Sequence, residues 1–445
     1  MFEDTIAAIS TSTLTKTAIS IVRISGKDAF TVLNKIFKTK DRNYQGYRIY
    51  YGHIYDPSNQ EIIDEVLVNT FIAPKSFTGE NLVEINCHGG LYVTSKVLTL
   101  VLSYGARMAL HGEFSKRAFL NGKIDLTQAE AINDLICADN KDSAKLAVNS
   151  LSGSISKMIN PLINDLEQCI AHIEVNIDYP EYDDNGIITA NEVSLLVEDW
   201  KKQCDKIINM AQNSLIIKEG IKTVIVGKPN VGKSSLLNAL LQQDKAIVSD
   251  VAGTTRDLVE GDIHLDNVTL HLIDTAGIHD TENDIEQIGI KKSRQALSEA
   301  QLVIVLIDSS DFDLEDEKLL EETENLNRLV VYNKKDLGIT FSGINISANN
   351  GDIDQLINAI NDLFKDSKLA LSQPVLTNER QIALMRQAKE AMESASRALS
   401  NNIPLDLINE DIQHAYRCLK EILGQYTRED LLDGIFSRFC VGKKK

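Results

Sequence analysis

The strongest chemical signature in this sequence is a phosphate-binding pattern near the middle of the chain. Residues 222–235 read KTVIVGKPNVGKSS, an expected strand that runs into the pattern G-x-x-x-x-G-K-[ST]. Small residues let such a loop curl so that its backbone N–H groups point at phosphate oxygens, and the following helix adds the positive end of its dipole. We expect Lys233 to reach the β- and γ-phosphates and Ser234 to ligate Mg²⁺. The residues expected at the nucleotide here are Asn230, Gly232, Lys233, Ser234 and Ser235.

Two further segments carry groups for the metal ion and the γ-phosphate. Asp274 opens Asp-Thr-Ala-Gly after an expected strand over 268–273, so its carboxylate can hold Mg²⁺ through water. The Gly277 N–H of the same motif can sense the γ-phosphate. Upstream, the switch segment Gly-Thr-Thr-Arg-Asp at 253–257 offers the Thr255 hydroxyl as a second Mg²⁺ ligand.

The residues expected to read the base come later, again at strand ends. Asn333-Lys334-Lys335-Asp336 follows an expected strand over 329–332, and Asp336 can accept hydrogen bonds from N1–H and the exocyclic amine of guanine. Adenine would leave that carboxylate unpaired, and a site built on such bonds rejects the analogue by about 10⁴. Ser347-Ala348-Asn349 would place the Ala348 N–H near the guanine O6. These motifs in this order predict a GTPase, and the base motif conflicts with an ATPase or a kinase.

The residue that would orient the attacking water is absent from its usual place. Many small GTPases have Gln directly after D-x-x-G, where this chain has the apolar Ile278. Glu286 is the nearest plausible carboxylate, with Glu282 and Asp284 as weaker candidates. Arg256 in the switch segment is a candidate for supplying positive charge in cis.

Composition indicates an ordinary globular protein. The chain has 445 residues, 43% of them hydrophobic and 25% charged, and a net charge of −18. Such acidity opposes non-specific binding to nucleic acid, so an RNA partner must meet a local basic patch. The six cysteines are scattered without a C-x-x-C pair, which predicts neither a disulfide framework nor a zinc site. We expect a cytoplasmic protein with no membrane segment, because the longest aliphatic runs are too short to span a bilayer.

The N-terminal part, residues 1–119, has a mixed pattern that predicts an α+β domain. Its expected strands and helices cover 18–25, 28–37, 65–73, 82–88 and 92–104. In the strand at 82–88, the period of two places Glu84, Asn86 and His88 on one polar face. That face is either the lining of a ligand cleft or the wet side of an antiparallel sheet.

The rest of the chain predicts an all-α domain with an α/β domain inserted in it. Thr127-x-x-Glu130 is an expected capping box, and helical periodicity continues past Pro161. We expect the first helical part at 120–215, a doubly wound nucleotide domain at 216–370 and the second helical part at 371–445. The last helix has an apolar stripe formed by Leu431, Leu432, Ile435, Phe436 and Phe439.

With these motifs in place, the whole chain resembles the tRNA modification GTPases of the MnmE family, also called TrmE. Outside the nucleotide motifs, the resemblance rests on Ile21–Gly26, Ser76–Glu80, His88–Gly90, Gly112–Phe119, Lys123–Glu130 and the terminal Phe439–Lys443. It implies an N-terminal domain that dimerises and binds formyl- or methylene-tetrahydrofolate. It also implies a flavoprotein partner, MnmG, in a heterotetramer that adds an aminomethyl or carboxymethylaminomethyl group to C5 of the wobble uridine in certain tRNAs.

The resemblance also assigns residues. The folate contacts of the family fall on Arg23, Glu84, Lys123 and Lys443. Its K⁺ ligands fall on Asn230, Ser249, Val251 and Thr254, its catalytic carboxylate falls on Glu286, and its terminal cysteine on Cys440. Two segments depart from the family pattern: the loop at 10–16 reads STSTLTK, and two lysines follow the usual terminal Gly-Lys.

One different class of function is compatible with the nucleotide motifs. A GTPase can act as a regulatory switch in ribosome assembly without taking part in RNA chemistry. Proteins of that kind normally add a basic RNA-binding module, whereas this chain is acidic and ends in expected helices. The sequence therefore favours tRNA modification.

Overall fold

The computed structural model describes residues 3–11, 16–40, 43–138, 140–178, 189–241, 262–265, 268–273, 300–365, 371, 373–426 and 429–439. The chain forms two compact units. The first consists of Met1–Cys137, Ala147–Val197 and Gln387–Lys445, and the second of Ala138–Leu146 and Glu198–Arg386. Within the described residues, no helix has both the length and the apolar character needed to cross a bilayer.

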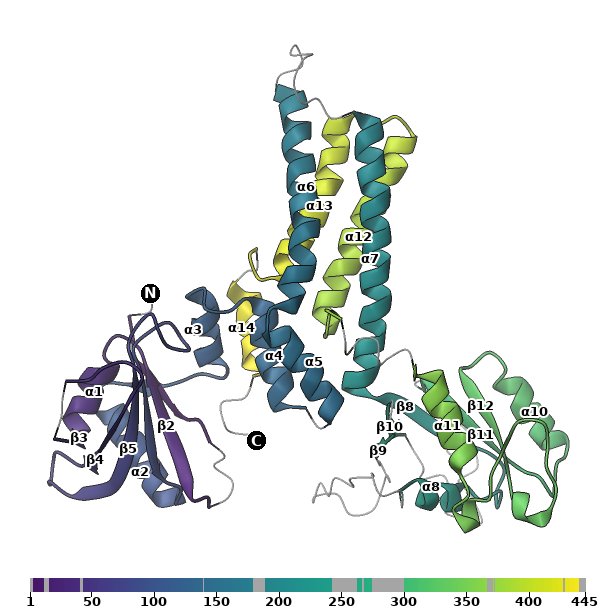
Figure 1. Ribbon diagram of the computed structural model, residues 1–445, viewed down its shortest axis with the longest axis horizontal. Coiled ribbons are helices and arrows are strands. Elements are labelled where there is room, and N and C mark those ends of the chain that lie inside the picture. The colour runs from purple at the N-terminus through teal and green to yellow at the C-terminus, as the bar shows by residue number, and fades with distance from the viewer. Residues whose placement is uncertain are drawn as a thin grey trace, which may run out of the picture. The chain divides into compact units, whose positions relative to one another are not determined.

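A seven-stranded sheet forms the N-terminal part of the first unit (Figure 1). Its strands are β1 (Ile6–Ile9), β2 (Ile19–Ser25), β3 (Phe37–Lys38), β4 (Arg48–Tyr55), β5 (Ile62–Phe71), β6 (Leu82–His88) and β7 (Arg107–Met108). They lie in the order β3-β4-β5-β6-β2-β1-β7, and only β1 and β7 run parallel. Helices α1 (Ala29–Ile36) and α2 (Leu91–Ser103) share a core with one face of this sheet, where Val22, Val68 and Ile85 are fully buried. Because strand side chains alternate, the polar and exposed side chains stand on the other face.

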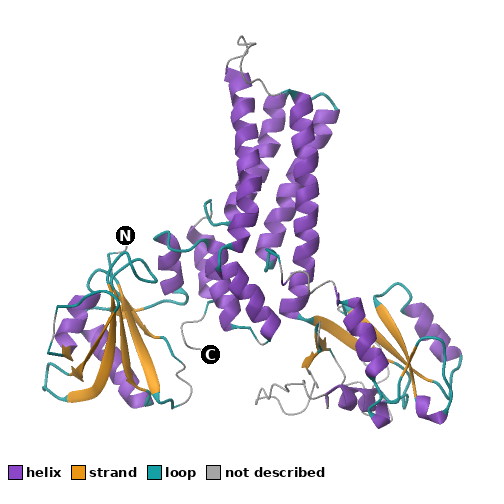
Figure 2. Cartoon of the chain, viewed as in Figure 1, coloured by secondary structure: helices purple, strands orange, loops and turns teal. Residues whose placement is uncertain are grey.

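The remainder of the first unit is helical, as the colouring of Figure 2 makes plain. The helices that lie wholly or partly in it include α3 (Glu113–Leu120), α4 (Leu126–Ile136), α5 (Lys141–Leu151), α6 (Ser154–Asp178), α13 (Leu405–Ile422) and α14 (Glu429–Ser437). Helices α6 and α13 lie side by side, and α6 continues through Pro161 as expected. Helix α14 packs on α3 and α4 through Leu126, Leu432 and Phe436.

Among the described residues, the second unit contains a six-stranded sheet with helices on both faces. Its strands are β8 (Ile221–Val226), β9 (Asp262–His264), β10 (Thr269–Leu272), β11 (Leu302–Asp308), β12 (Arg328–Asn333) and β13 (Ile344–Asn345). They lie in the order β13-β12-β11-β8-β10-β9, parallel except for β9. Helices α8 (Lys233–Leu241) and α11 (Asp354–Leu363) share a core on one face, and α10 (Leu314–Glu322) packs on the other. The chain order reverses at β8, and ligands bind at such switch points in doubly wound folds.

The nucleotide domain is an insertion, because the chain enters and leaves it at the same place. Helix α7 (Ala190–Glu219) runs into β8 through Gly220, and the returning chain leads into α12 (Glu379–Ser400). The Ser214 hydroxyl donates to the Leu376 carbonyl at 2.5 Å, and Lys218 donates to the Thr377 carbonyl at 3.1 Å. These hydrogen bonds hold the segment that enters the nucleotide domain against the segment that leaves it, within the second unit.

Three expectations about local structure are corrected. The capping box of α4 uses Asp125 and Gln128 rather than Thr127 and Glu130: the Asp125 carboxylate accepts from the Gln128 N–H at 2.9 Å. Thr127 lies inside the first turn of α4, and its hydroxyl donates to Asp125 Oδ1 at 2.6 Å. Leu431 is 42% exposed, so it is not part of the apolar stripe of α14. Strands β1, β4 and β7 and helix α3 are not among the predicted elements.

Two glycines flank α3, and they differ in how closely helix α14 approaches them. Gly112 and Gly122 both have left-handed backbone, with φ of 63° and 66°. A Cβ on Gly112 would stand 2.5 Å from the Phe436 carbonyl oxygen, whereas a Cβ on Gly122 would meet nothing within 4 Å.

We expect Gly122→Ala to cost only the left-handed strain, about 1 kcal/mol, and therefore to lower Tm by about 2–4 °C. Gly112→Ala must also displace α14, so its loss of Tm in differential scanning calorimetry should be at least twice as large. Equal losses would contradict the close contact.

Candidate functional site

The phosphate-binding loop leaves the C-terminal end of β8 and leads directly into α8. The Lys233 ammonium donates to the carbonyls of Gly227 and Lys228, at 2.9 and 2.8 Å, and so lies over the loop. Ser234 is exposed in the first turn of α8, and Ser235 is half-buried beside it. Lys233, predicted to contact phosphate, and Ser234, predicted to ligate Mg²⁺, therefore both stand at the N-terminus of α8, where the dipole and the free N–H groups favour an anion.

Two loop residues have backbone conformations that bring the loop against the base motif. Asn230 has φ of 61° and Gly232 has φ of 101°. Asn accepts the left-handed region more readily than most residues, because its short amide can bond locally. A Cβ on Gly232 would overlap the side-chain amide of Asn333, so this position needs glycine for its contact as well as its conformation.

The expected base-reading residues meet around one buried amide. Asn333 is 3% exposed, and its Nδ2 donates to the Val231 carbonyl at 2.8 Å. Its Oδ1 accepts from the Ala348 N–H at 3.0 Å. The Ser347 hydroxyl donates to Asp336 Oδ1 at 2.6 Å, which orients this exposed carboxylate. The phosphate loop and both base motifs are thus brought together in the described part of the site.

Lys334, also expected at the nucleotide, forms an ion pair with Asp308 at the end of β11. Burial alone would raise the pKa of Asp308, but hydrogen bonds from Lys334 and Ser310 outweigh it and hold that pKa below its ordinary value. Asp308 is therefore ionised at neutral pH and keeps the Lys334 side chain next to the base motif.

The structure adds one residue that the sequence analysis misses. The Lys228 ammonium contacts Asp313 at 2.9 Å, Asp316 at 2.8 Å and the Asp311 carbonyl at 3.0 Å, which occupies all three of its donors. The hydrogen bonds that the Lys228 ammonium donates to the two carboxylates raise the pKa of Lys228. The phosphate loop is therefore tied to the N-terminus of α10. The capping box at Asp313 is readable in the sequence, but its partner 85 positions earlier has no local signal.

Several predicted site residues lie outside the described residues. They are Ser249, Val251, Thr254, Thr255, Asp274, Gly277 and Glu286 in the nucleotide domain, and Cys440 and Lys443 near the chain end.

A second group of predicted residues lies on the open face of the N-terminal sheet. Arg23 of β2 and Glu84 of β6 are direct cross-strand partners, and the Arg23 Nε and Nη2 donate to Glu84 Oε1 at 3.0 and 2.8 Å. Both side chains are partly exposed, at 28% and 17%. Asn69 of the next strand lies opposite Glu84. The Asn69 Nδ2 donates to the second Glu84 oxygen, Oε2, at 3.5 Å, so Arg23, Glu84 and Asn69 form a hydrogen-bonded row across three strands of the open face.

The surroundings of this pair include two aromatic rings. The Arg23 guanidinium carbon lies 6.0 Å from the Phe77 ring centroid and 5.6 Å from that of Phe114. Lys123, the third predicted folate contact, lies in the same compact unit, and its ammonium donates to the Pro74 carbonyl at 3.0 Å. The sequence analysis gives the two rings no role, since their motifs do not reveal that both meet Arg23.

His88, on the expected polar face, has a carboxylate partner. Its Nδ1 lies 2.7 Å from Asp64 Oδ1, and its backbone N–H donates to Asp64 Oδ2 at 2.8 Å. The hydrogen bond to Asp64 raises the pKa of His88. The bond therefore holds the exposed imidazole to β5.

The reversal of strand order at β8, the phosphate loop and the guanine motif define a GTP hydrolase of the P-loop class. Residues 126–440 match the family model of the MnmE helical domain, and residues 5–123 match that of the GTP-binding protein TrmE N-terminus. The chain belongs to the MnmE family of tRNA modification GTPases.

Curated relatives match the chain over nearly all of its length. The protein called tRNA modification GTPase MnmE from Lactobacillus gasseri is 45% identical, over 99% of this chain and 98% of its own. Proteins of the same name from Lactobacillus johnsonii and Streptococcus gordonii are 45% and 44% identical, over 99% of this chain and 98% and 99% of theirs.

Asp336→Asn tests the base assignment. An amide can donate where the carboxylate accepts, so we expect the variant to lose GTP affinity by a factor on the order of 10⁴ and to gain affinity for xanthosine triphosphate. Fluorescent-nucleotide competition measures both. Lys335→Met, at an exposed ion pair with Asp352 in the same loop, serves as the matched control and should bind GTP normally. Unchanged GTP affinity in Asp336→Asn would contradict the assignment.

Proposed function

We propose that this chain hydrolyses GTP in the modification of tRNA. With a flavoprotein partner of the MnmG kind, it adds an aminomethyl or carboxymethylaminomethyl group to C5 of the wobble uridine, using a one-carbon unit from tetrahydrofolate. The observation that carries this proposal is the match to relatives named tRNA modification GTPases across 99% of the chain. The guanine-nucleotide motifs support the proposed GTP hydrolysis, and the Arg23–Glu84 pair supports the proposed use of tetrahydrofolate.

The proposed tetrahydrofolate site is centred on Arg23 and Glu84. A pterin ring presents a donor and an acceptor on one edge, which complements the partly exposed Glu84 carboxylate beside the Arg23 guanidinium. Lys123 and Lys443 are proposed to hold the glutamate carboxylates by charge. Formyl- or methylene-tetrahydrofolate would supply the carbon atom.

Calorimetric titration with 5-formyl-tetrahydrofolate tests this site. Removing a charge-assisted hydrogen bond costs about 1.5–3 kcal/mol, so Arg23→Ala and Glu84→Gln should each weaken binding about tenfold or more. Arg48→Ala, an exposed arginine of the same sheet, is the control and should bind as the parent does. Parent-like binding by the first two variants would remove the folate assignment.

We also propose that the chain is a homodimer that joins through the open face of its N-terminal sheet. Large apolar side chains are exposed on this face: Ile49 at 67%, Tyr51 at 59% and Leu67 at 47%. Tyr51 and Leu67 are direct cross-strand partners, and Ile49 lies opposite Asn69. A contiguous exposed apolar patch of this kind marks an interaction surface. A second copy would cover it.

Hydrolysis is proposed to depend on K⁺ and on Glu286. The exposed Asn230 side chain in the phosphate loop supports a monovalent ion there, with Ser249, Val251 and Thr254 as further ligands. The ion would place positive charge where an arginine finger acts in other GTPases, an effect worth about 10³ to 10⁵ in rate. Glu286 would polarise the water that Ile278 cannot orient, and Mg²⁺ would be held by Ser234 and Thr255, with Asp274 acting through water.

Turnover measured in K⁺ and in Na⁺ tests this mechanism. We expect Na⁺ to slow hydrolysis strongly, Asn230→Ala to abolish the response to K⁺, and Arg256→Ala to matter little. Glu286→Ala should lose turnover yet bind GTP normally, because its role is confined to the chemical step. If two nucleotide domains must meet, turnover per molecule should also rise with protein concentration. Equal rates in the two salts, or full activity of Glu286→Ala, would point to Arg256 and Glu282 instead.

The remaining parts of the proposal follow the same family. The domain boundaries are proposed at 1–119, 120–215, 216–370 and 371–445, and the protein is proposed to act in the cytoplasm. Because the net charge is −18, tRNA is proposed to meet a local basic surface rather than the chain as a whole.

A further inference from the structure

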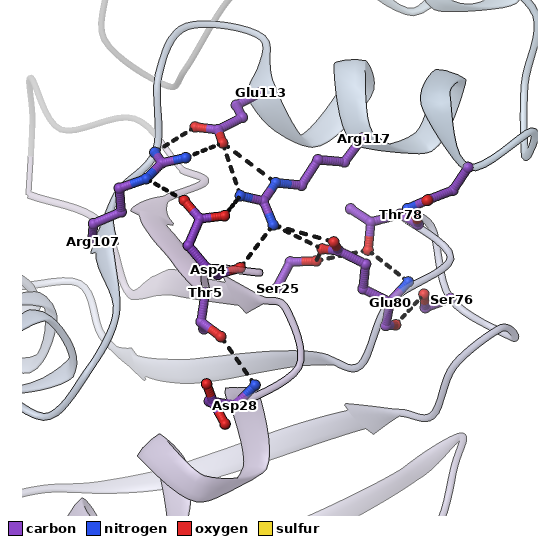
Figure 3. Close-up of polar contacts among 11 residues, drawn as sticks. Asp4, Thr5, Ser25, Asp28, Ser76, Thr78, Glu80, Arg107, Glu113 and Arg117 are labelled. Carbon is purple, nitrogen blue, oxygen red and sulfur yellow. Dashed lines mark hydrogen bonds and ion pairs between the residues drawn. The ribbon is translucent and has the colours of Figure 1, made fainter. Parts of the chain in front are cut away.

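A buried arginine of the N-terminal domain lies behind the proposed folate site. Arg117 of α3 is 0% exposed. Its guanidinium donates to the Asp4 carbonyl at 3.1 Å, the Asp4 carboxylate at 2.8 Å, the two Glu80 oxygens at 3.2 and 3.3 Å, and Glu113 at 2.9 Å (Figure 3). Arg107, which is 43% exposed, joins the cluster through Glu113 and Asp4.

A buried ionic cluster of this kind is weak as a source of stability. Removing charges from water costs about as much as their attraction returns, and apolar side chains of similar volume often serve equally well. What the cluster defines is geometry, since the planar guanidinium fork accepts carboxylates only along set directions. Arg117 therefore fixes α3, the chain near Asp4 and the loop that contains Glu80 relative to one another.

The same cluster reaches the strand that carries Arg23. The Ser25 hydroxyl donates to Glu80 Oε2 at 2.8 Å and shares a hydrogen bond of 2.7 Å with the Thr78 hydroxyl (Figure 3). Ser25 follows Arg23 by two positions on β2, so both side chains stand on the open face of the sheet. Glu80 thus joins Arg117 to the edge of the proposed site.

The two elements held by Arg117 also carry the two rings at Arg23. Phe114 belongs to α3, one turn before Arg117, and Phe77 belongs to the loop that ends at Glu80. At 5.6 and 6.0 Å from the guanidinium carbon, both rings are within the range of cation–π attraction. The two rings constrain the plane of the Arg23 guanidinium. They therefore also constrain the direction of Nη1, the guanidinium nitrogen that does not donate to Glu84.

We propose that Arg117 is a positioning residue for the Arg23–Glu84 pair, and that it acts through Glu80, Phe77 and Phe114 without touching the ligand. This inference rests on the proposed tetrahydrofolate site. Losing Arg117 frees α3 and the Phe77 loop, so the Arg23 fork samples more orientations and binds the ligand less often in the right one.

The test is titration of the full-length chain with 5-formyl-tetrahydrofolate, together with Tm and GTP affinity for each variant. Arg117→Met should weaken folate binding about tenfold or more, and Arg117→Lys should recover Tm better than affinity, because an ammonium lacks the planar fork. Phe114→Leu leaves the ionic cluster intact and should lose a comparable part of the affinity at near-parent Tm. If Arg117→Met does not fold, the folate affinities of Phe114→Leu and Phe77→Leu test the proposal in its place. GTP affinity should stay at the parent value throughout.

Two comparisons separate positioning from other causes. Arg107→Met removes an arginine of the same cluster that has no bond to Glu80, and it should bind folate as the parent does; a loss equal to that of Arg117→Met overturns the proposal. In an Arg23→Ala background, adding Phe114→Leu should not weaken folate binding any further if the ring acts through Arg23. A persisting effect means that the ring contacts the ligand and overturns the positioning role.

Failure of this inference is distinguishable from failure of the folate site. If Glu84→Gln and Arg23→Ala lose folate while folded Arg117 and Phe114 variants bind it as tightly as the parent, the site stands and the positioning role is wrong. If Glu84→Gln and Arg23→Ala bind folate normally, the site itself is wrong.

Discussion

The nucleotide domain depends on one buried amide. The Asn333 side chain uses its donor on the phosphate loop at Val231 and its acceptor on the Ala348 N–H, so the loop that holds phosphate and the loop that reads the base are fixed by the same group. An aspartate here would lose the donor, and an alanine would leave a buried carbonyl and a buried N–H unpaired. Gly232 is small because this amide stands against it.

The N-terminal domain achieves the same kind of control with charge. Its open sheet face carries the Arg23–Glu84 pair, and the buried Arg117 of α3 binds Glu80, which accepts a hydrogen bond from Ser25 of β2. Burying these ions adds little to the free energy of unfolding. Their proposed role is to fix the orientation of the side chains around Arg23. Both units therefore place a predicted ligand contact beside a buried, hydrogen-bonded side chain.

Local chemistry made much of the architecture predictable. The strand at Leu82–His88 has the predicted bounds, and the phosphate loop lies between β8 and α8 because glycine spacing and helix propensity act over a few residues. The predictions fail where two local solutions compete. Asp125 and Thr127 are both residue types that cap helices, and in the fold Asp125 caps α4 while the Thr127 hydroxyl donates to Asp125. Leu431 fits the apolar period of α14, yet it stays exposed because nothing described packs over it.

By itself the sequence determined the class of chemistry, because phosphate and guanine recognition are written in short runs of residues whose backbone does the binding. It also determined the polar row of β6 that contains Glu84, since the strand period is local. Only the tertiary structure decided which distant residues meet. Lys228 forms an ion pair with Asp316, and the rings of Phe77 and Phe114 lie near the Arg23 guanidinium. Arg117 forms ion pairs with both Asp4 and Glu80. The partners are far apart in the sequence, where no periodic pattern relates them. Such contacts arise from packing of whole elements, which no local pattern encodes.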